Sequence, residues 1–174
     1  MHLKKIWKTT AALVLLASLA GCGYHFKGVG LTAPAGVRTI AVTVLENRTS
    51  ESGIESHFTG DIAYEFTRSK VLRVVGADAA DAVLSGTVAS LVSDTISHDA
   101  KFMSDERRVA ITLDLAVKRR DGEIIWSDRA LSGREVFKVD SSDKLATERN
   151  KRTAIKAISK RLAEKVHDRI LLDF

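Results

Sequence analysis

The sequence predicts an α+β domain, in which a mixed sheet of four to five strands packs against two helices in the order β-α-β-β-β-β-α. Three observations support this prediction. Apolar side chains recur every three to four residues in 54–66 and again in 145–172, whereas they alternate strictly in 109–117. The first spacing is typical of a helix that buries one side, and the second of a strand that buries one face. Length, at 174 residues, allows one domain with a real core.

The first predicted unit is β-α-β. Residues 37–45 are rich in β-branched side chains and predict a strand with one face formed by Ile40, Val42 and Val44. The polar residues 46–50 predict a turn, and a helix follows whose apolar side consists of Ile54, Phe58, Ile62 and Phe66. Residues 71–75 predict a short second strand, which is expected to run parallel to the first after a right-handed crossover.

Three further strands are predicted after residue 82. Residues 82–96 are β-prone with irregular alternation, and residues 98–106 predict a polar loop or hairpin tip. Strict alternation then predicts a strand whose buried face consists of Val109, Ile111, Leu113, Leu115 and Val117. Asp121-Gly122 is a hairpin signal, and residues 124–137 are expected to return as the partner strand.

Two core predictions complete the fold. Trp126 is expected to anchor the core, because it shares an alternating face with Ile124 and Ala130. Residues 145–172 predict a terminal helix whose apolar stripe consists of Ile155, Ile158, Leu162, Val166 and Ile170. The other faces of this helix carry many lysine and arginine side chains.

The N-terminus predicts a lipoprotein signal peptide over residues 1–21. Three lysines precede an apolar run, 11–20, which is too short for the roughly twenty residues that span a bilayer. The run ends at Leu19-Ala20-Gly21-Cys22, which resembles the lipobox of bacterial lipoproteins. That resemblance implies that Cys22 carries an S-diacylglycerol and, after cleavage, an N-acyl group. The alternative is a plain cleavable signal with a chance cysteine.

Signal removal changes how the rest of the chain is interpreted. Residues 22–36, rich in glycine and holding the only proline, predict a lipidated tether before a single domain at 37–174. Loss of three lysines lowers the formal net charge from +5 to about +2, which argues against a nucleic-acid partner. Cys22 is the only cysteine, so the exported domain must rely on packing rather than on disulfides.

The residues predict no enzyme. No pair of the five histidines has the i, i+4 spacing of a helical metal site, and no Gly-x-Ser-x-Gly motif occurs. Acidic residues are mostly interleaved with basic ones, as in solvated ion pairs. We therefore expect no catalytic residue, no metal site and no cofactor apart from the covalent lipid on Cys22.

Positive charge is concentrated around the predicted hairpin. Basic side chains begin the strand, flank its turn and lie on the return strand, at Arg107, Arg108, Lys118, Arg119, Arg120, Arg129 and Arg134. Several are expected to converge near one end of the sheet, where guanidinium groups would suit phosphorylated lipid. The alternative is an ordinary charged surface that protects edge strands.

Directly after the lipobox, Cys22-Gly23-Tyr24-His25-Phe26 resembles the mature start of the LptE family of lipopolysaccharide-assembly lipoproteins. The resemblance continues through residues 37–49, the helix after them, Ile124-Ile125-Trp126-Ser127, and the last helix at 167–170. It implies a fold in which two helices pack against a mixed four-stranded sheet.

The same resemblance implies a function. LptE-like proteins assemble with the outer-membrane β-barrel LptD, plug its lumen and help to deliver lipopolysaccharide to the outer leaflet. Gly23 after the lipidated cysteine implies the outer membrane, with the domain facing the periplasm. The family's lipid-binding positions are basic residues in strands and loops, for which the candidates here are Arg107, Arg108, Arg129 and Arg134.

A second resemblance leaves an alternative open. Residues 40–49 also resemble the opening strand and turn of other envelope lipoproteins, the CsgG secretion pore and LpoB-type activators of peptidoglycan synthases. An LpoB-type protein usually carries a long proline-rich linker. The tether here is only about fourteen residues and reaches at most roughly 50 Å, which favours the LptE family.

Overall fold

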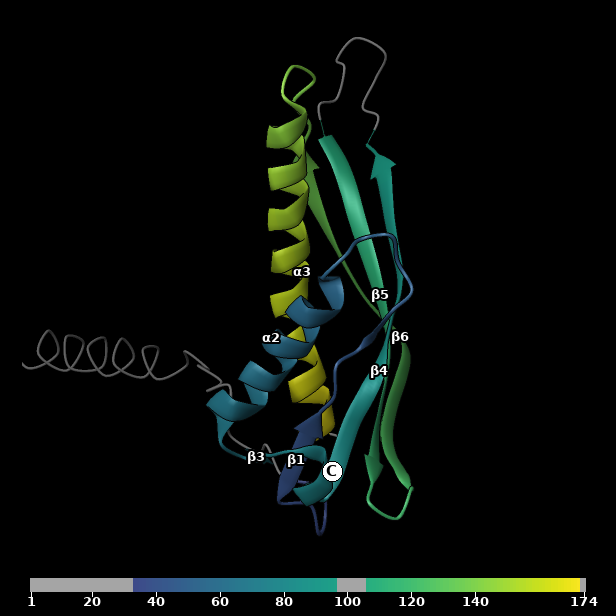
Figure 1. The fold of residues 1–174 in the computed structure, drawn as a ribbon, viewed down its shortest axis with the longest axis vertical. Coiled ribbons are helices and arrows are strands. Elements are labelled where there is room, and N and C mark those ends of the chain that lie inside the picture. Colours follow the sequence, from purple (N-terminus) through teal and green to yellow (C-terminus); the bar gives the residue numbers. More distant parts are fainter. Residues whose placement is uncertain (1–32, 97–105, 173–174) are drawn as a thin grey trace, which may run out of the picture. The chain divides into compact units, whose positions relative to one another are not determined.

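The computed structural model describes residues 33–96 and 106–172, and these fold as the predicted α+β unit (Figure 1). The signal peptide, Cys22 and nearly all of the predicted loop at 98–106 lie outside the described residues. The elements in chain order are β1 (Thr39–Val42), β2 (Glu46–Asn47), α2 (Ile54–Ser69), β3 (Arg73–Val74), the 3-10 helix η2 (Ala77–Ala79), β4 (Ala82–Thr95), β5 (Glu106–Arg119), β6 (Ile124–Lys138) and α3 (Lys144–Leu172).

The strands form one mixed six-stranded sheet in the order β3-β1-β4-β5-β6, with β2 also paired to β4. β1 runs parallel to both β3 and β4, whereas β4, β5 and β6 are antiparallel. The predicted parallel β-α-β unit and the predicted hairpin are therefore confirmed. The sheet has one strand more than expected, because Glu46 and Asn47 pair with Thr87 and Val88 of β4 instead of forming only a turn.

The prediction of one continuous strand over 37–45 is wrong in its second half. β1 ends at Val42, and Val44 is 71% exposed, whereas Leu45 is buried. Both the backbone nitrogen and the hydroxyl of Thr43 donate to the Leu84 carbonyl, which holds the chain beside β4 after the strand ends. The Leu45 nitrogen donates to Thr59 Oγ1 on α2, so that Leu45 rather than Val44 turns into the core.

Both helices cover the same face of the sheet. The predicted apolar side of α2 is confirmed, since Ile54, Phe58, Ile62 and Phe66 are buried to within 1% exposure. The predicted stripe of α3 is buried as well, and α3 runs alongside β6 and packs on α2 (Figure 1). Within the described residues, neither helix is long and apolar enough to cross a membrane.

β5 supplies the centre of the core. Its odd-numbered side chains from Val109 to Val117 are buried, and its even-numbered neighbours face away from the helices. Trp126 is buried as predicted, but Ile124 is 56% exposed and Ala130 is exposed. The shared face predicted for these three residues is wrong, because β6 changes register between the pairs Val117–Trp126 and Lys118–Ile124 and again between Leu115–Asp128 and Leu113–Leu131.

Asp81 joins the starts of β1 and β4. Its Oδ2 accepts hydrogen bonds from the backbone nitrogens of Arg38 and Thr39 and from Thr39 Oγ1, at 2.8–3.0 Å. The Asp81 nitrogen donates back to Thr39 Oγ1. The Arg38 amide and the Thr39 hydroxyl and amide lower the pKa of the Asp81 carboxyl, since they stabilise its ionised form. This reciprocal bonding fixes the register of a parallel strand pair that is only three residues long.

The Asp81→Asn variant is expected to unfold at a lower urea concentration than the wild type at pH 7. Because the folded-state pKa of Asp81 lies below its unfolded value, its contribution is present above about pH 4 and is lost as the pH falls through the folded pKa. The difference between the two proteins should therefore shrink below pH 4. Urea titrations at several pH values measure it, with Glu148→Gln, an exposed side chain, as control. A pH-independent difference would contradict this role.

Gly86 allows β4 and β5 to approach closely. A Cβ at this position would lie 2.1 Å from the Asp114 carbonyl and 2.8 Å from Leu115 Cδ2. Gly86→Ala should therefore destabilise the fold by about 1–3 kcal/mol, as overpacking does. Gly60→Ala on α2, where nothing lies within 4 Å, should instead stabilise it by about 0.5–1 kcal/mol. Chemical denaturation checks both, and a Gly86→Ala variant as stable as the wild type would refute the close approach.

Candidate functional site

The face of the sheet opposite the helices is open at β4, β5 and β6. Cross-strand partners share a face, so the even-numbered residues of β5, which are half-buried or exposed, identify their neighbours on this face. Small and polar side chains occupy its middle, including Ser90, Thr112 and Ser132. At the end near residue 95, the apolar side chains Val92 and Val136 are 50% and 42% exposed.

Two of the predicted arginines meet at that end of the open face. Arg108 lies opposite Val136, and Arg134 lies opposite Ala110, one step further along the same face. This register makes Arg108 and Arg134 diagonal neighbours, with Cβ atoms on the order of 7–8 Å apart. Neither side chain forms an ion pair within the described part of the chain. We call these two residues, with Val92 and Val136, the open-face cluster.

The remaining two candidates lie elsewhere. Arg107 pairs with the buried Phe137, so it belongs to the helix-covered face at the end of β5. Arg129 lies in the bulge opposite Asp114 and is exposed. Five residues of strand separate it from Arg134, roughly 16 Å at 3.3 Å per residue. The four predicted arginines therefore do not form one site.

The basic residues beside the hairpin turn lie at the other end of β5, and Arg119 and Arg120 have partners of their own. Lys118 lies ten residues along β5 from Arg108, roughly 33 Å away. Arg119 donates to the Ala35 carbonyl at 2.8 Å and pairs with Glu123, while Arg120 donates to the carbonyls of Asp78 and Ala80. The prediction that these charges converge at one end of the sheet is thus wrong, because a 14-residue strand separates them. The hydrogen bonds of Arg119 and Arg120 hold the segment before β1 and the 3-10 helix η2 in place.

Residues 33–37 already contact the domain. Pro34 is buried, Ala33 packs against the core, and the Val37 nitrogen donates to the Pro34 carbonyl at 2.9 Å. Gly36 has a φ of 80°, which favours glycine in this turn. The last residues of the predicted tether are therefore docked where β1 begins.

Polar side chains between the two helices contribute to their packing. In the described ranges no three His, Cys, Asp or Glu side chains gather as metal ligands would. His167 is buried, lies edge-on to Phe66 at 5.3 Å between ring centroids, and has its Nδ1 3.1 Å from Asp168 Oδ1. Ser159 donates to Asp61 Oδ2 at 2.5 Å across the two helices.

Solved structures show the same fold at low sequence identity. Lipoprotein B from Nitrosomonas europaea matches with a TM-score of 0.59 and 13% identity, covering 86% of this chain and 90% of that one. A minor lipoprotein from Acinetobacter baumannii matches with a TM-score of 0.55 and 15% identity, covering 79% and 93%. Rare lipoprotein B from Shewanella oneidensis gives 0.51 and 17%, covering 75% and 92%.

No curated protein sequence matches the chain. The family model described as LptE, lipopolysaccharide-assembly, matches residues 37–170, from just before β1 nearly to the end of α3. The predicted resemblance is confirmed: the chain belongs to the LptE family, a non-catalytic family of lipopolysaccharide-assembly lipoproteins of the cell envelope.

Proposed function

We propose that the protein is an outer-membrane lipoprotein that assembles with the LptD β-barrel, plugs its lumen and helps to deliver lipopolysaccharide to the outer leaflet. The observation that carries this proposal is the LptE match over residues 37–170, behind a lipobox that ends at Cys22. Residues 1–21 are the cleaved signal, residues 22–36 the tether, and residues 37–174 the periplasm-facing domain. The family match favours this function over a CsgG-type or LpoB-type role.

The lipid on Cys22 confines the domain to the membrane surface. One acyl chain gives only marginal binding, whereas several chains on one cysteine hold a protein there for practical purposes. A short tether also raises the effective concentration of the domain at a membrane-embedded partner. Residues 33–36 are docked on the domain, so about ten residues after Cys22 remain to span the distance.

The open-face cluster supplies chemistry that suits lipopolysaccharide. Arg108 and Arg134 can each give two parallel hydrogen bonds to a phosphate. Asp94 lies beside Arg108 on β4, but neither arginine forms an ion pair with a carboxylate of the described chain. Val92 and Val136 lie beside them and offer an apolar surface to acyl chains. A ligand with both phosphate and hydrocarbon matches this pattern better than a purely ionic one.

Replacement of Cys22 by alanine should leave the protein unprocessed or mislocalised. Without the thiol no diacylglycerol is attached, so the chain loses the anchor that holds it at the membrane. Membrane fractionation with lipid labelling measures both effects. Unchanged fractionation of the Cys22→Ala variant with the outer membrane would show that the anchor lies elsewhere.

Purification of the full chain from outer membranes should recover a large β-barrel, and depletion of the protein should reduce surface lipopolysaccharide. The physical reason is that a plug buried in a barrel lumen dissociates slowly. Affinity purification with mass spectrometry identifies the partner. Recovery of a peptidoglycan synthase in its place would support the LpoB-type alternative.

Arg108→Gln and Arg134→Gln should each weaken lipopolysaccharide binding by about ten- to a hundredfold, because each removes a charge-assisted hydrogen bond of about 1.5–3 kcal/mol. Arg129→Gln is the matched control, since Arg129 is an exposed arginine of the same sheet outside the cluster. Binding of labelled lipopolysaccharide to the purified full chain gives the affinities. Equal losses in all three variants would indicate a diffuse charge effect and remove the cluster from the proposal.

A further inference from the structure

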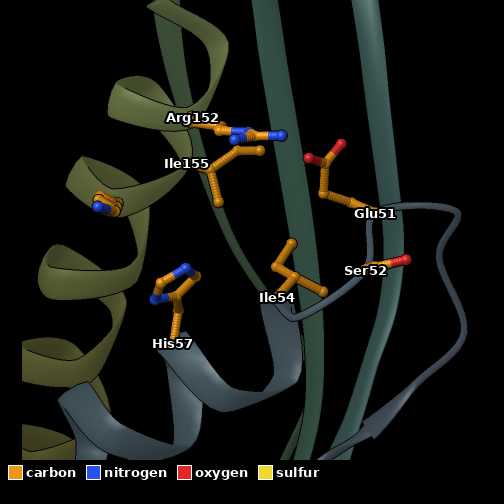
Figure 2. Close-up of a pocket in the computed structure, with 7 residues that line it drawn as sticks. Glu51, Ser52, Ile54, His57, Arg152 and Ile155 are labelled. Carbon is orange, nitrogen blue, oxygen red and sulfur yellow. The ribbon is translucent and has the colours of Figure 1, made fainter. Parts of the chain in front are cut away.

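A cavity of about 330 Å³ opens between the start of α2 and the N-terminal half of α3, on the helix-covered side of the sheet (Figure 2). The buried side chains Ile54 and Ile155 form its apolar floor. Its polar wall consists of Glu51, Ser52, His57, Arg152 and Lys156. The volume lies at the lower end of the roughly 300–1,000 Å³ found for small-molecule sites.

Positive charge exceeds negative charge around this cavity. Lys151 Nζ lies 2.5 Å from Glu51 Oε2, so the single carboxylate of the wall already has a cationic partner. Arg152 and Lys156 are one turn apart on α3, and neither forms an ion pair with a described residue. Figure 2 shows Arg152 extending over Ile155 into the space between α3 and Glu51, with the His57 ring below it.

The wall opposite α3 is held in place by Asn47. Its Nδ2 donates to the Glu51 carbonyl at 2.9 Å and to Glu55 Oε2 at 2.8 Å. Its Oδ1 accepts from the nitrogen and the hydroxyl of Thr49, both at 2.8 Å. One side chain thus fixes the loop from β2 to α2, so that the cavity is shaped before any ligand enters.

We propose that this cavity binds a phosphate group, carried either by a soluble phosphate ester or by a lipid headgroup. The Arg152 guanidinium matches two phosphate oxygens, and Lys156 adds a second positive charge one turn away. His57 can donate from the α2 side, and Ile54 and Ile155 place an apolar surface beside Arg152 and Lys156. The cavity and the open-face cluster lie on opposite faces of the sheet, so this site is separate from the one in the proposed function.

A cation does not fit the same cavity. Its only carboxylate is already paired with Lys151, and two further positive charges border it. An anion with a single negative charge would neutralise only one of the two positive charges of Arg152 and Lys156. A phosphate monoester carries close to two negative charges at neutral pH and has three terminal oxygens, which matches both side chains.

Calorimetric titration of inorganic phosphate into the detergent-purified full chain, at constant ionic strength, tests the site. Saturable binding is expected, and Arg152→Gln and Lys156→Gln should each weaken it at least fivefold. Lys160→Gln is the matched control, because Lys160 is exposed one turn further along α3 and does not line the cavity. Absence of saturable binding, or an equal loss with Lys160→Gln, would overturn the proposal.

Competition then identifies the source of the phosphate. Micelles that carry phosphatidic acid should displace inorganic phosphate if the site takes a lipid headgroup, whereas phosphatidylcholine micelles should not. Phosphate binding that phosphatidic acid leaves unchanged assigns the site to a soluble ester. Because Arg108 and Arg134 can also hold phosphate, the titration is repeated in an Arg108→Gln/Arg134→Gln background, where Arg152→Gln should still weaken phosphate binding at least fivefold. Failure of the proposed function and failure of this site are then distinguishable, and disappearance of the Arg152→Gln effect in that background would overturn the separation of the two sites.

Discussion

The buried face of β5 is the constraint on which the rest of the structure depends. Five side chains from Val109 to Val117 point at the helices, and each contributes about 1.5–3 kcal/mol through burial. A surface ion pair contributes only about 0–1 kcal/mol, so apolar burial rather than charge determines which face of β5 is buried. Because successive strand residues point to opposite sides, burial of this set turns Arg108 outward. Strand pairing then brings Arg134 to the same face.

The buried face of β5 was predictable because apolar and polar residues alternate strictly along it. In the neighbouring strands β4 and β6, bulges interrupt this alternation. β4 changes register between Val88 and Ser90, and β6 does so around Arg129. Trp126 and Leu131 therefore both face the core although they are five residues apart, which strict alternation forbids. A bulge is a property of two paired strands, so the sequence of one strand does not reveal its position. The helices were easier to predict, since the apolar spacing is regular along α2 and along α3 from Ala154 onward.

The sequence predicted the candidate residues, but not which of them lie close together in the fold. The sequence shows the basic residues around the hairpin directly. The length of β5 separates Arg108 from Lys118, however, and the pairing of β5 with β6 brings Arg108 close to Arg134. The sequence did not predict the cavity between α2 and α3, because the basic face of α3 resembles an ordinary solvated surface. Helical spacing places Arg152 and Lys156 on one side, but only the docking of α2 brings His57 opposite them. Such a contact, between residues far apart in the chain, leaves no local pattern.

The way α3 covers β6 bears on how the domain could meet a β-barrel. Arg161 donates to the Arg134 carbonyl at 2.9 Å, and Asn150 donates to the Lys138 carbonyl at 3.0 Å. Side chains of α3 thus occupy outward carbonyls of β6, the strand whose free edge would otherwise invite another strand. A closed barrel has no free edge to offer in return. An assembly with LptD, as proposed, is therefore expected to use side-chain contacts rather than strand addition at β6, and the open face is the one that the helices leave accessible.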